Sequence, residues 1–168
     1  MICGLDASTS TIGWAIADGN VILDAGFVDI KDCKTSKEKS FKLIGVLQSR
    51  SLFPKIEKFH LEAALSGFAG GFTSQMVIIK LSRFNAVFEF IIGEEWKKPV
   101  ELWNVNTARK RVLGKCREKG MKSKVFVETN LALLHDIHKF DVLNKKGNPD
   151  KRNGDIYDAM VLALAAPA

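Results

Sequence analysis

Cysteine is scarce in this sequence of 168 residues, and its few copies lie far apart. The three cysteines, Cys3, Cys33 and Cys116, are odd in number and lack the spacing of metal ligands. A disulfide framework needs pairs of cysteines, and a structural zinc site needs cysteines or histidines at short, regular separations. The sequence therefore predicts neither, and it indicates a protein of a reducing compartment.

Long apolar runs are missing as well. No stretch approaches the roughly 18 apolar residues that a membrane helix needs, and no basic region precedes an apolar one at the N-terminus. With 46% hydrophobic residues, the chain has the composition and size of one ordinary domain with a real core. We expect a single domain over residues 1–168, located in the cytoplasm and without a membrane partner.

Basic residues outnumber acidic ones, and the excess is unevenly placed. The net charge is +6, while residues 104–152 alone hold 13 Lys and Arg against 5 Asp and Glu. The densest part, NTARKRVLGKCREKGMKSK (residues 106–124), has eight basic residues and one acidic residue, Glu118. Clustered basic charge is typical of a surface that binds the phosphate backbone of nucleic acid. A basic helix face that meets only solvent is the open alternative.

The first 17 residues, MICGLDASTSTIGWAIA, predict two apolar strands joined by a polar turn. The first strand has no solvent face, which is typical of a central strand covered on both sides, and Asp6 lies at its end. An isolated buried carboxylate costs several kcal/mol or gives up its charge, so Asp6 needs a metal, a cation or backbone donors. Alternatively, Asp6 caps the turn through its side chain.

Periodicity and turn signals predict the next elements. Residues 20–30 form a third strand, so three antiparallel strands open the fold. Residues 31–39 connect this strand to a helix of about fifteen residues, and Pro54 is expected to end that helix. Its 3.6-residue period is set by Phe41, Ile44, Leu47 and Gln48. Residues 59–65 form a short buried strand that carries Glu62, and we expect His60 on the same face to be a packing histidine.

Residues 66–72, SGFAGGF, predict a glycine-rich loop with two phenylalanines, Phe68 and Phe72. Either aromatic ring folds back onto the core, or one of them stacks on bases of a distorted nucleic acid. Further on, residues 99–105 predict a strand and residues 125–135 an amphipathic helix. His135 and His138 are one turn apart, but no carboxylate or cysteine lies at ligand spacing, so we expect no metal there.

Residues 73–95 predict the longest helix, with Thr73 or Ser74 as N-cap. One apolar side consists of Val77, Leu81, Phe84, Phe88 and Ile91. A second consists of Met76, Ile79, Ala86, Val87 and Phe90, and a polar strip holds Ser82, Asn85 and Glu89. A helix that is apolar on two sides is buried on two sides, so one side packs on the sheet and the other predicts a second helix or a homodimer.

The C-terminal stretch DIYDAMVLALAAPA predicts a helix after a polar linker at residues 141–154. Asp155 and Asp158 are three residues apart and share a face, while the remaining face is apolar. Acidic residues are favoured at a helix N-terminus, so Asp155 could be a plain cap. Asp158 lies deeper in the helix than a cap requires, which favours a functional role for the pair.

Four carboxylates thus occur at places where a sheet and a terminal helix could bring them together: Asp6, Glu62, Asp155 and Asp158. If they converge, they repel one another unless divalent cations lie between them. Ligands that offer only oxygen suit Mg²⁺ or Mn²⁺ rather than zinc. Two such ions, roughly 4 Å apart, activate a water and stabilise the leaving oxygen in phosphodiester cleavage.

The motifs GLDASTSTIGWAI, LEAAL and DIYDAMVLALA, in this order, resemble the acidic motifs of RuvC-type Holliday junction resolvases, within the RNase H-like nuclease superfamily. The resemblance covers nearly the whole chain. It implies an α/β RNase H-like fold, a five-stranded mixed sheet with its first three strands antiparallel and flanked by helices. It also implies that Asp6, Glu62, Asp155 and Asp158 are catalytic acids that bind two Mg²⁺ per active site, with Mn²⁺ as a substitute.

The same resemblance implies a structure-selective, Mg-dependent endodeoxyribonuclease that resolves four-way and branched DNA. The enzyme is expected to act as a homodimer that makes paired nicks, and to use no nucleotide cofactor. Its compact size and Lys-rich character resemble the phage or viral branch. The family uses basic residues near the cleaved phosphate, for which the candidates are Arg109 and Lys122, with Lys110, Arg111, Lys115 and Lys124 beside them. Leu65 stands where the family has a junction-stacking Phe, and Phe68 is the candidate replacement. Dimerisation through the long helix implies an interface at Met76, Ile79, Arg83, Val87 and Phe90.

Two other interpretations stay open. The first is a nuclease of the same fold that acts on RNA–DNA hybrid or broadly on flaps and forks. The second starts from GLDASTSTIGWA, which also resembles the first phosphate loop of actin-like ATPases and sugar kinases. Those proteins need two domains and a second phosphate loop, and 168 residues provide neither.

Overall fold

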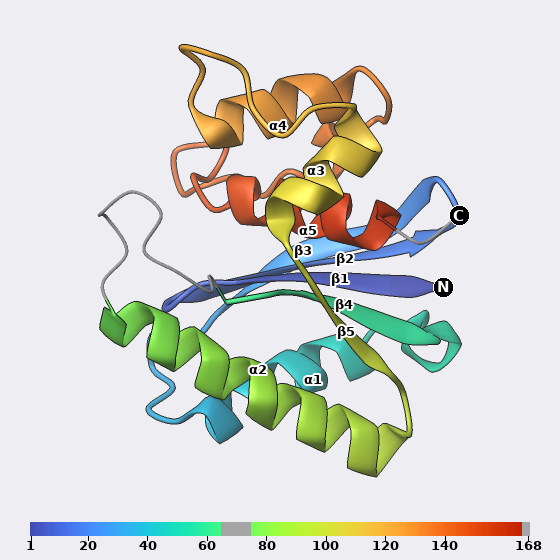
Figure 1. The fold of residues 1–168 in the computed structure, drawn as a ribbon, viewed down its shortest axis with the longest axis vertical. Coiled ribbons are helices and arrows are strands. Elements are labelled where there is room, and N and C mark those ends of the chain that lie inside the picture. Colours follow the sequence, from blue (N-terminus) through green and yellow to red (C-terminus); the bar gives the residue numbers. More distant parts are fainter. Residues whose placement is uncertain (65–74, 166–168) are drawn as a thin grey trace.

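A five-stranded mixed sheet forms the centre of the protein (Figure 1). The computed structural model describes residues 1–64 and 75–165. The strands are β1 (Ile2–Ala7), β2 (Thr11–Asp18), β3 (Val21–Asp29), β4 (Lys58–Glu62) and β5 (Val100–Trp103). They lie in the order β3-β2-β1-β4-β5. The first three pair antiparallel, as predicted for this mixed sheet, and β4 and β5 run parallel to β1.

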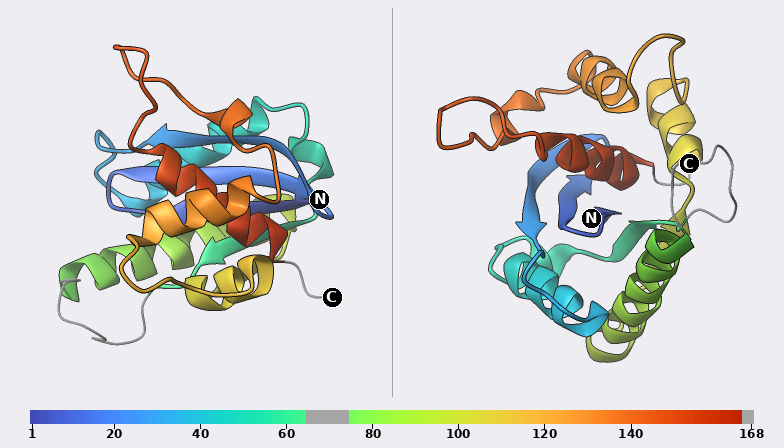
Figure 2. Two further views of the ribbon diagram at one scale, coloured as in Figure 1. Left: turned by 90° about the horizontal axis from the view of Figure 1, so that it is seen from above. Right: turned by 90° about the vertical axis from the view of Figure 1, so that its left-hand side faces the viewer.

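Helices cover both faces of this sheet (Figures 1 and 2). One face packs against α1 (Ser36–Gln48) and α2 (Gln75–Trp96), and the other against α5 (Asn153–Leu164), which α3 (Val105–Leu113) and α4 (Ser123–Ala132) cover in turn. Two short 3₁₀ helices, η1 (Phe53–Lys55) and η2 (His138–Phe140), lie in the connections. Within residues 1–64 and 75–165, no helix is both long and apolar enough to cross a membrane.

The two faces of the sheet differ in side-chain size, because successive residues of a strand point to opposite sides. Toward α1 and α2 the strands present large buried side chains: Cys3, Leu5, Ile12, Trp14, Ile16, Phe59 and Leu61. Phe88 of α2 meets Phe59 edge to face, with ring centroids 5.6 Å apart. Because α5 covers the other face, β1 and β2 are buried on both sides, as the apolar run of the first strand predicts.

Toward α5 the two central strands present small residues: Gly4, Gly13, Ala15 and Ala17. A Cβ atom on Gly4 would lie 2.1 Å from the backbone oxygen of Ala159, and a Cβ on Gly13 would lie 2.1 Å from that of Asp155. Real Cβ atoms do not approach backbone so closely, so only glycine fits at either position. The two glycines thus let α5 lie directly on the backbone of β1 and β2.

The helix after β3 begins earlier and ends sooner than predicted. Its start is fixed by Thr35, whose side chain accepts a hydrogen bond from the backbone N–H of Glu38 at 3.1 Å. After Gln48 the chain turns, and the hydroxyl of Ser49 donates to the carbonyl of Val46 at 2.7 Å. The prediction that Pro54 ends this helix is wrong: Pro54 lies in η1.

Other predicted boundaries shift by a few residues. The β4 strand ends at Glu62, and α4 begins at residue 123 rather than 125. The β5 strand ends at Trp103 because the side chain of Asn104 caps α3, accepting from the backbone N–H groups of Asn106 and Thr107 at 3.0 and 3.3 Å. The basic segment therefore begins within a helix.

Candidate functional site

Asp6 and Glu62 come from neighbouring parallel strands and point to the same side of the sheet. In the register of β1 and β4, Gly4 lies beside His60, so the residues two places further on, Asp6 and Glu62, continue the same face. That face is the one covered by α5. Both acids lie at the carboxyl ends of their strands, which is where open α/β sheets place their ligand sites.

The terminal helix brings the other two acids to the same place. Gly13 pairs with Asp6 across the β1–β2 ladder, and its bare Cα lies against the first turn of α5 at Asp155. Asp158 follows one turn later on the same helix face. All four acids, Asp6, Glu62, Asp155 and Asp158, line one cavity of about 350 Å³. The convergence predicted from the sequence is therefore present in the structure.

Two basic side chains reach these acids from α3 and α4. The guanidinium of Arg109 donates to Oδ1 of Asp158 through Nη2 at 2.7 Å and through Nε at 3.3 Å, and its Nη1 donates to the hydroxyl of Ser123 at 2.7 Å. Both side chains of this ion pair are about nine-tenths buried. Arg109 is therefore enclosed between three helices, where its planar fork holds the carboxylate of Asp158 in one orientation.

Lys124 forms the second ion pair, with Oδ1 of Asp155. Its side chain lines the acidic cavity and is half exposed. Gly154 makes room for it, because a Cβ atom at residue 154 would lie 2.6 Å from Cδ of Lys124. Lys124, unlike Arg109, can therefore leave its acid and reach a ligand at the mouth of the cavity.

The four acids perturb one another electrostatically. Burial raises the pKa of Asp6 well above its ordinary value, and the hydrogen bond with Glu62 and the charges of the other acids raise it further. Burial also raises the pKa of Asp158, against the opposing effect of Arg109. Although burial opposes it, the hydrogen bond to Asp155 raises the pKa of Lys124. The cavity therefore has a surplus of negative charge that a bound cation would relieve.

The donor set fits a hard divalent cation, because all four acids offer only oxygen. As the side chains stand, no group of three or more His, Cys, Asp or Glu within residues 1–64 and 75–165 is arranged to hold a metal ion. Asp155 and Asp158 face Lys124 and Arg109 instead. Coordination of a cation would therefore use Oδ2 of Asp158, to which Arg109 does not bind, and would require Asp155 to turn from Lys124 into the cavity.

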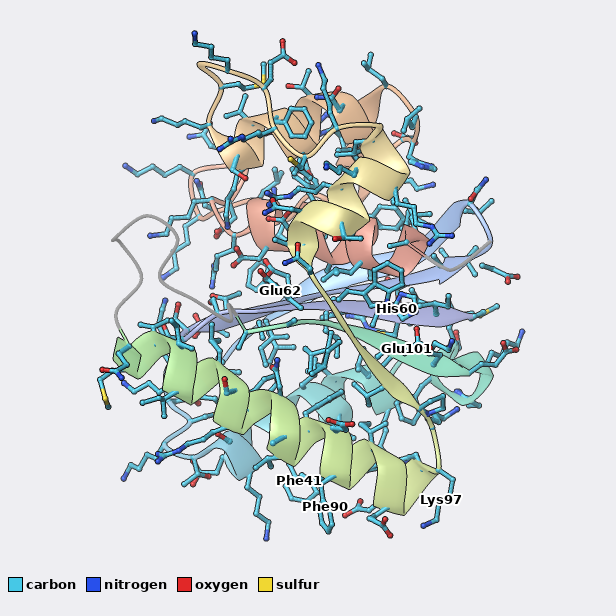
Figure 3. All side chains as sticks on the ribbon, viewed as in Figure 1. Phe41, His60, Glu62, Phe90, Lys97 and Glu101 are labelled. Atoms are coloured by element: carbon cyan, nitrogen blue, oxygen red, sulfur yellow. The ribbon has the colours of Figure 1, made fainter. Side chains whose placement is uncertain are left out.

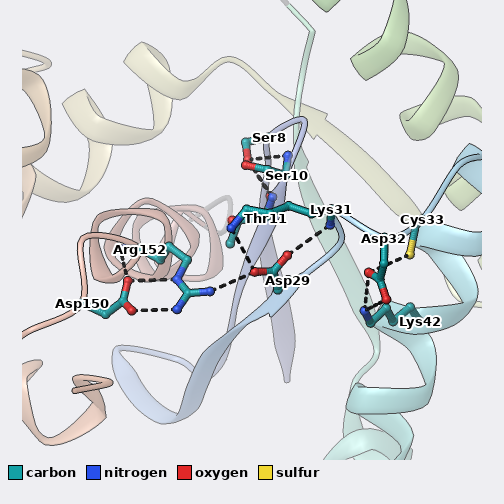
Figure 4. Close-up of polar contacts among 10 residues, drawn as sticks. All are labelled: Ser8, Ser10, Thr11, Asp29, Lys31, Asp32, Cys33, Lys42, Asp150 and Arg152. Carbon is teal, nitrogen blue, oxygen red and sulfur yellow. Dashed lines mark hydrogen bonds and ion pairs between the residues drawn. The ribbon is translucent and has the colours of Figure 1, made fainter. Parts of the chain in front are cut away.

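Polar contacts fix the chain on either side of the acids (Figure 4). After Asp6, the hydroxyl of Ser8 donates to the carbonyl of Thr11 at 2.8 Å and accepts from its N–H at 3.0 Å, which closes the β1–β2 turn. Before α5, Arg152 donates to both carboxylate oxygens of Asp150 and to Oδ2 of Asp29 on β3. These contacts hold the start of α5 against the sheet.

The remaining four basic candidates occupy four different places. Lys110 lines a hollow of about 390 Å³ together with Arg117. Lys115 pairs with Glu118 at 2.6 Å, and Lys122 is exposed at the N-cap position of α4. Arg111 lines a separate cavity at the β2–β3 turn, at the opposite end of the sheet from Asp6. Of the six predicted basic residues, only Arg109 and Lys124 contact the acids.

The predicted two-sided character of the long helix is visible in its exposure. Phe84, Phe88 and Ile91 are buried against the core. On the other side Met76 is 59% and Phe90 69% exposed, Arg83 is exposed, and Ile79 and Val87 are half-buried. Phe41 of α1, predicted on an apolar face, is 41% exposed, and it points away from the sheet at the same lower edge as Phe90 (Figure 3).

His60 packs in the core, as predicted. It is fully buried, its Nδ1 donates to the carbonyl of Leu162 at 2.9 Å, and burial lowers its pKa. Its Nε2 lies 3.3 Å from Oε2 of Glu101 but without hydrogen-bond geometry. His138 contacts Asp141 at 3.0 Å, remote from the four acids. Phe68 and Phe72, the candidate DNA-stacking residues, lie outside the described residues.

One buried residue near the acids was assigned to the wrong surface. The sequence placed Asn85 on the polar strip of the long helix, but its side chain is only 4% exposed and borders the acidic cavity. One feature of the sequence could have indicated the inward position of Asn85: it is uncharged and directly follows Phe84, on a helix whose apolar residues face the sheet. An apolar pattern alone could not show which polar residue turns inward.

The fold and the site together define a class: an RNase H-like α/β protein with an acidic cavity at the carboxyl ends of its central parallel strands. Neither a family model nor a curated protein matches the sequence. Solved structures of two resolvases have the same fold. RuvC of Thermus thermophilus in complex with a Holliday junction substrate matches with a TM-score of 0.62 and 15% identity, over 98% of this chain and 90% of RuvC.

A second structure of the Thermus thermophilus RuvC matches with a TM-score of 0.58 and 13% identity, over 98% of this chain and 91% of that one. The yeast mitochondrial Holliday junction resolvase Ydc2 matches with a TM-score of 0.62 and 14% identity, over 98% of this chain and 76% of Ydc2. This protein therefore has the RuvC-type fold that its motifs predict.

Proposed function

We propose that the protein is a metal-dependent, structure-selective endodeoxyribonuclease that hydrolyses phosphodiester bonds in four-way and other branched DNA. The observation that carries this proposal is the gathering of Asp6, Glu62, Asp155 and Asp158 in one cavity. The cavity lies on the fold of RuvC, a protein whose solved complex holds a Holliday junction. A purely structural role would not require four carboxylates to share a space where they repel one another.

The acidic and basic residues at the cavity have different roles in this proposal. Asp6 and Glu62, from the rigid sheet, would hold one divalent cation, and Asp155 and Asp158, from α5, would hold a second. Two bound cations supply an activated water and stabilise the leaving oxygen of the phosphodiester. Arg109 stays enclosed and orients Asp158, while the half-exposed Lys124 turns from Asp155 toward a DNA phosphate.

The surface beside the cavity suits the substrate. Arg109 contacts Asp158 of the acidic cavity and, together with Ser123, lines a second hollow of about 610 Å³, which Arg117 and Lys119 also line. Lys110 lies in the adjoining hollow. These residues belong to α3 and the connection to α4, the most basic part of the sequence. They would bind the DNA backbone while the acids cut it.

Paired cuts in a symmetric junction require two active sites, so we propose that the protein acts as a homodimer. The exposed side of α2, with Met76, Ile79, Arg83, Val87 and Phe90, is the proposed interface. Large apolar side chains such as Met76 and Phe90 gain stability when a second copy covers them. The exposed Phe41 on the neighbouring α1 extends the same surface.

The direct test is a cleavage panel of four-way junction, fork, flap, duplex and RNA–DNA hybrid in Mg²⁺, Mn²⁺ and Ca²⁺. The proposal predicts paired symmetric nicks in the junction, and it predicts that Asp6→Asn abolishes cutting but keeps binding. Asp18→Asn, which changes an exposed acid at the end of β2, is the matched control and should cut normally. Preferential cleavage of hybrid would instead identify a nuclease of the same fold that acts on RNA.

A further inference from the structure

Asn85 is a polar side chain in an apolar environment. It lies on α2 directly beside Phe84, within the helix that packs against the large-residue face of the sheet, and only 4% of it is exposed. A buried amide has to satisfy its donors and its acceptor within the protein, because an unmade hydrogen bond there is costly. Its partners therefore indicate why the position holds an asparagine.

One half of the amide has a partner. Nδ2 donates to the backbone carbonyl of Glu62 at 2.9 Å. Because a carbonyl can only accept, the amide nitrogen must face Glu62, which fixes the orientation of the whole group. Together with the hydrogen bond from the N–H of Ala63 to the carbonyl of Trp103 at 2.8 Å, this contact holds the end of β4 in place.

The other half has none. Oδ1 of Asn85 is buried without a hydrogen-bond partner in the part of the chain that the structure describes. The residue borders the acidic cavity together with Asp6 and Glu62, which hydrogen-bond each other, so a proton kept on Asp6 is directed at Glu62. None of the described residues therefore donates to Oδ1, and a ligand that enters the cavity can supply the donor.

A hydrated divalent cation brings such donors, because Mg²⁺ keeps several of its waters when carboxylates bind it. Resting on the proposed function, we infer that Asn85 is a positioning residue for the cation site. Its Nδ2 holds the main chain that carries Glu62, and its Oδ1 accepts a hydrogen bond from the hydration shell of a cation at Asp6 and Glu62. The long helix thereby contributes to the site as well as to the core.

Metal titration without DNA tests this role. Mn²⁺ is titrated into the wild type, Asn85→Leu and Phe88→Leu, with the affinity measured by calorimetry and the melting temperature of each metal-free protein by circular dichroism. Asn85→Leu keeps the volume of the side chain and removes both polar groups. Phe88→Leu is the matched control, because it weakens the same helix–sheet contact without bordering the cavity. If Asn85→Leu fails to fold, Asn85→Ala replaces it.

We expect Asn85→Leu to lower the Mn²⁺ affinity about 10- to 100-fold, the usual effect of removing a partner behind the metal ligands. Phe88→Leu should lower the melting temperature and leave the affinity unchanged. Unchanged affinity in Asn85→Leu, or an equal loss in Phe88→Leu, would overturn the inference while leaving the proposed function intact. A wild type that takes up no Mn²⁺ would overturn both.

Discussion

A methyl group on Gly13 tests whether the close approach of α5 builds the site. A Cβ atom there would lie 2.1 Å from the carbonyl oxygen of Asp155 and 2.4 Å from its carbonyl carbon. These are backbone atoms, so no side chain can rotate away. An ordinary C···O contact is about 3.3 Å, so the first turn of α5 must withdraw by about 1 Å in Gly13→Ala.

Both the stability and the activity should suffer. Overpacking of this kind typically costs about 1–3 kcal/mol, and the rigid contact places Gly13→Ala at the upper end. For a protein of this size, about 3 kcal/mol lowers the melting temperature by about 6–12 °C. A displacement of about 1 Å in catalytic groups can cost about 100-fold in rate. The assays are thermal unfolding and junction cleavage in saturating Mg²⁺.

Gly45→Ala is the matched control. Gly45 lies in α1 with nothing within 4 Å of its added Cβ, so alanine should stabilise the helix by up to about 1 kcal/mol without affecting cleavage. If Gly13→Ala has the melting temperature and cleavage rate of the wild type, the close contact of α5 with the backbone of β2 does not bring the acids together. This explanation of the site would then be wrong.

Further predictions concern the charges and the proposed interface. Because burial and neighbouring acids raise the pKa of Asp6 above its ordinary 3.8, the folded protein holds that proton after the unfolded chain has lost it. Without metal, the stability of the folded protein should therefore fall as the pH rises from the unfolded to the folded pKa of Asp6. In Asp6→Asn this fall should be weaker. Melting temperatures measured in EDTA across the acidic and neutral pH range test both expectations. Gly154→Ala should displace Lys124, because its added Cβ would clash with that side chain. It should reduce cleavage to the same extent as Lys124→Met, with little change in melting temperature. Gly93→Ala is the control: its added Cβ meets nothing within 4 Å, so cleavage should be unchanged. Arg109→Met leaves a buried acid without its partner and should cost about 3–5 kcal/mol of stability in denaturant unfolding; an unchanged unfolding midpoint would contradict the assignment. Phe90→Asp should shift sedimentation from dimer to monomer, while equal sedimentation of variant and wild type would exclude α2 as the interface.

The order of elements and the four acids could be predicted because both depend on local pattern. An apolar run without a solvent face identifies the first, central strand, and an acid inside an apolar strand, such as Glu62, is rare enough to be conspicuous. For these features the sequence pattern and the structure agree. The parallel pairing of β1 with β4 brings Asp6 and Glu62 to one face, and the sequence pattern alone does not specify that pairing.

What could not be predicted depends on contacts between distant elements. The requirement for glycine at Gly4 and Gly13 arises only from the backbone of α5, more than 140 residues later in the chain. The choice of Lys124 rather than Lys122 depends on where α4 begins, a boundary that the sequence placed two residues late. The inward position of Asn85 depends on its bond to the β4 backbone. None of these has a local signature.

The proposed function depends on the four acids forming one divalent-cation site. Anomalous diffraction from crystals grown with Mn²⁺ tests it most directly, because the signal locates the metal independently of any activity. Anomalous density is expected inside the cavity, at coordination distance from the carboxylates of Asp6 and Glu62, and it should disappear in Asp6→Asn. Density only elsewhere on the surface, or none at saturating Mn²⁺, would contradict it.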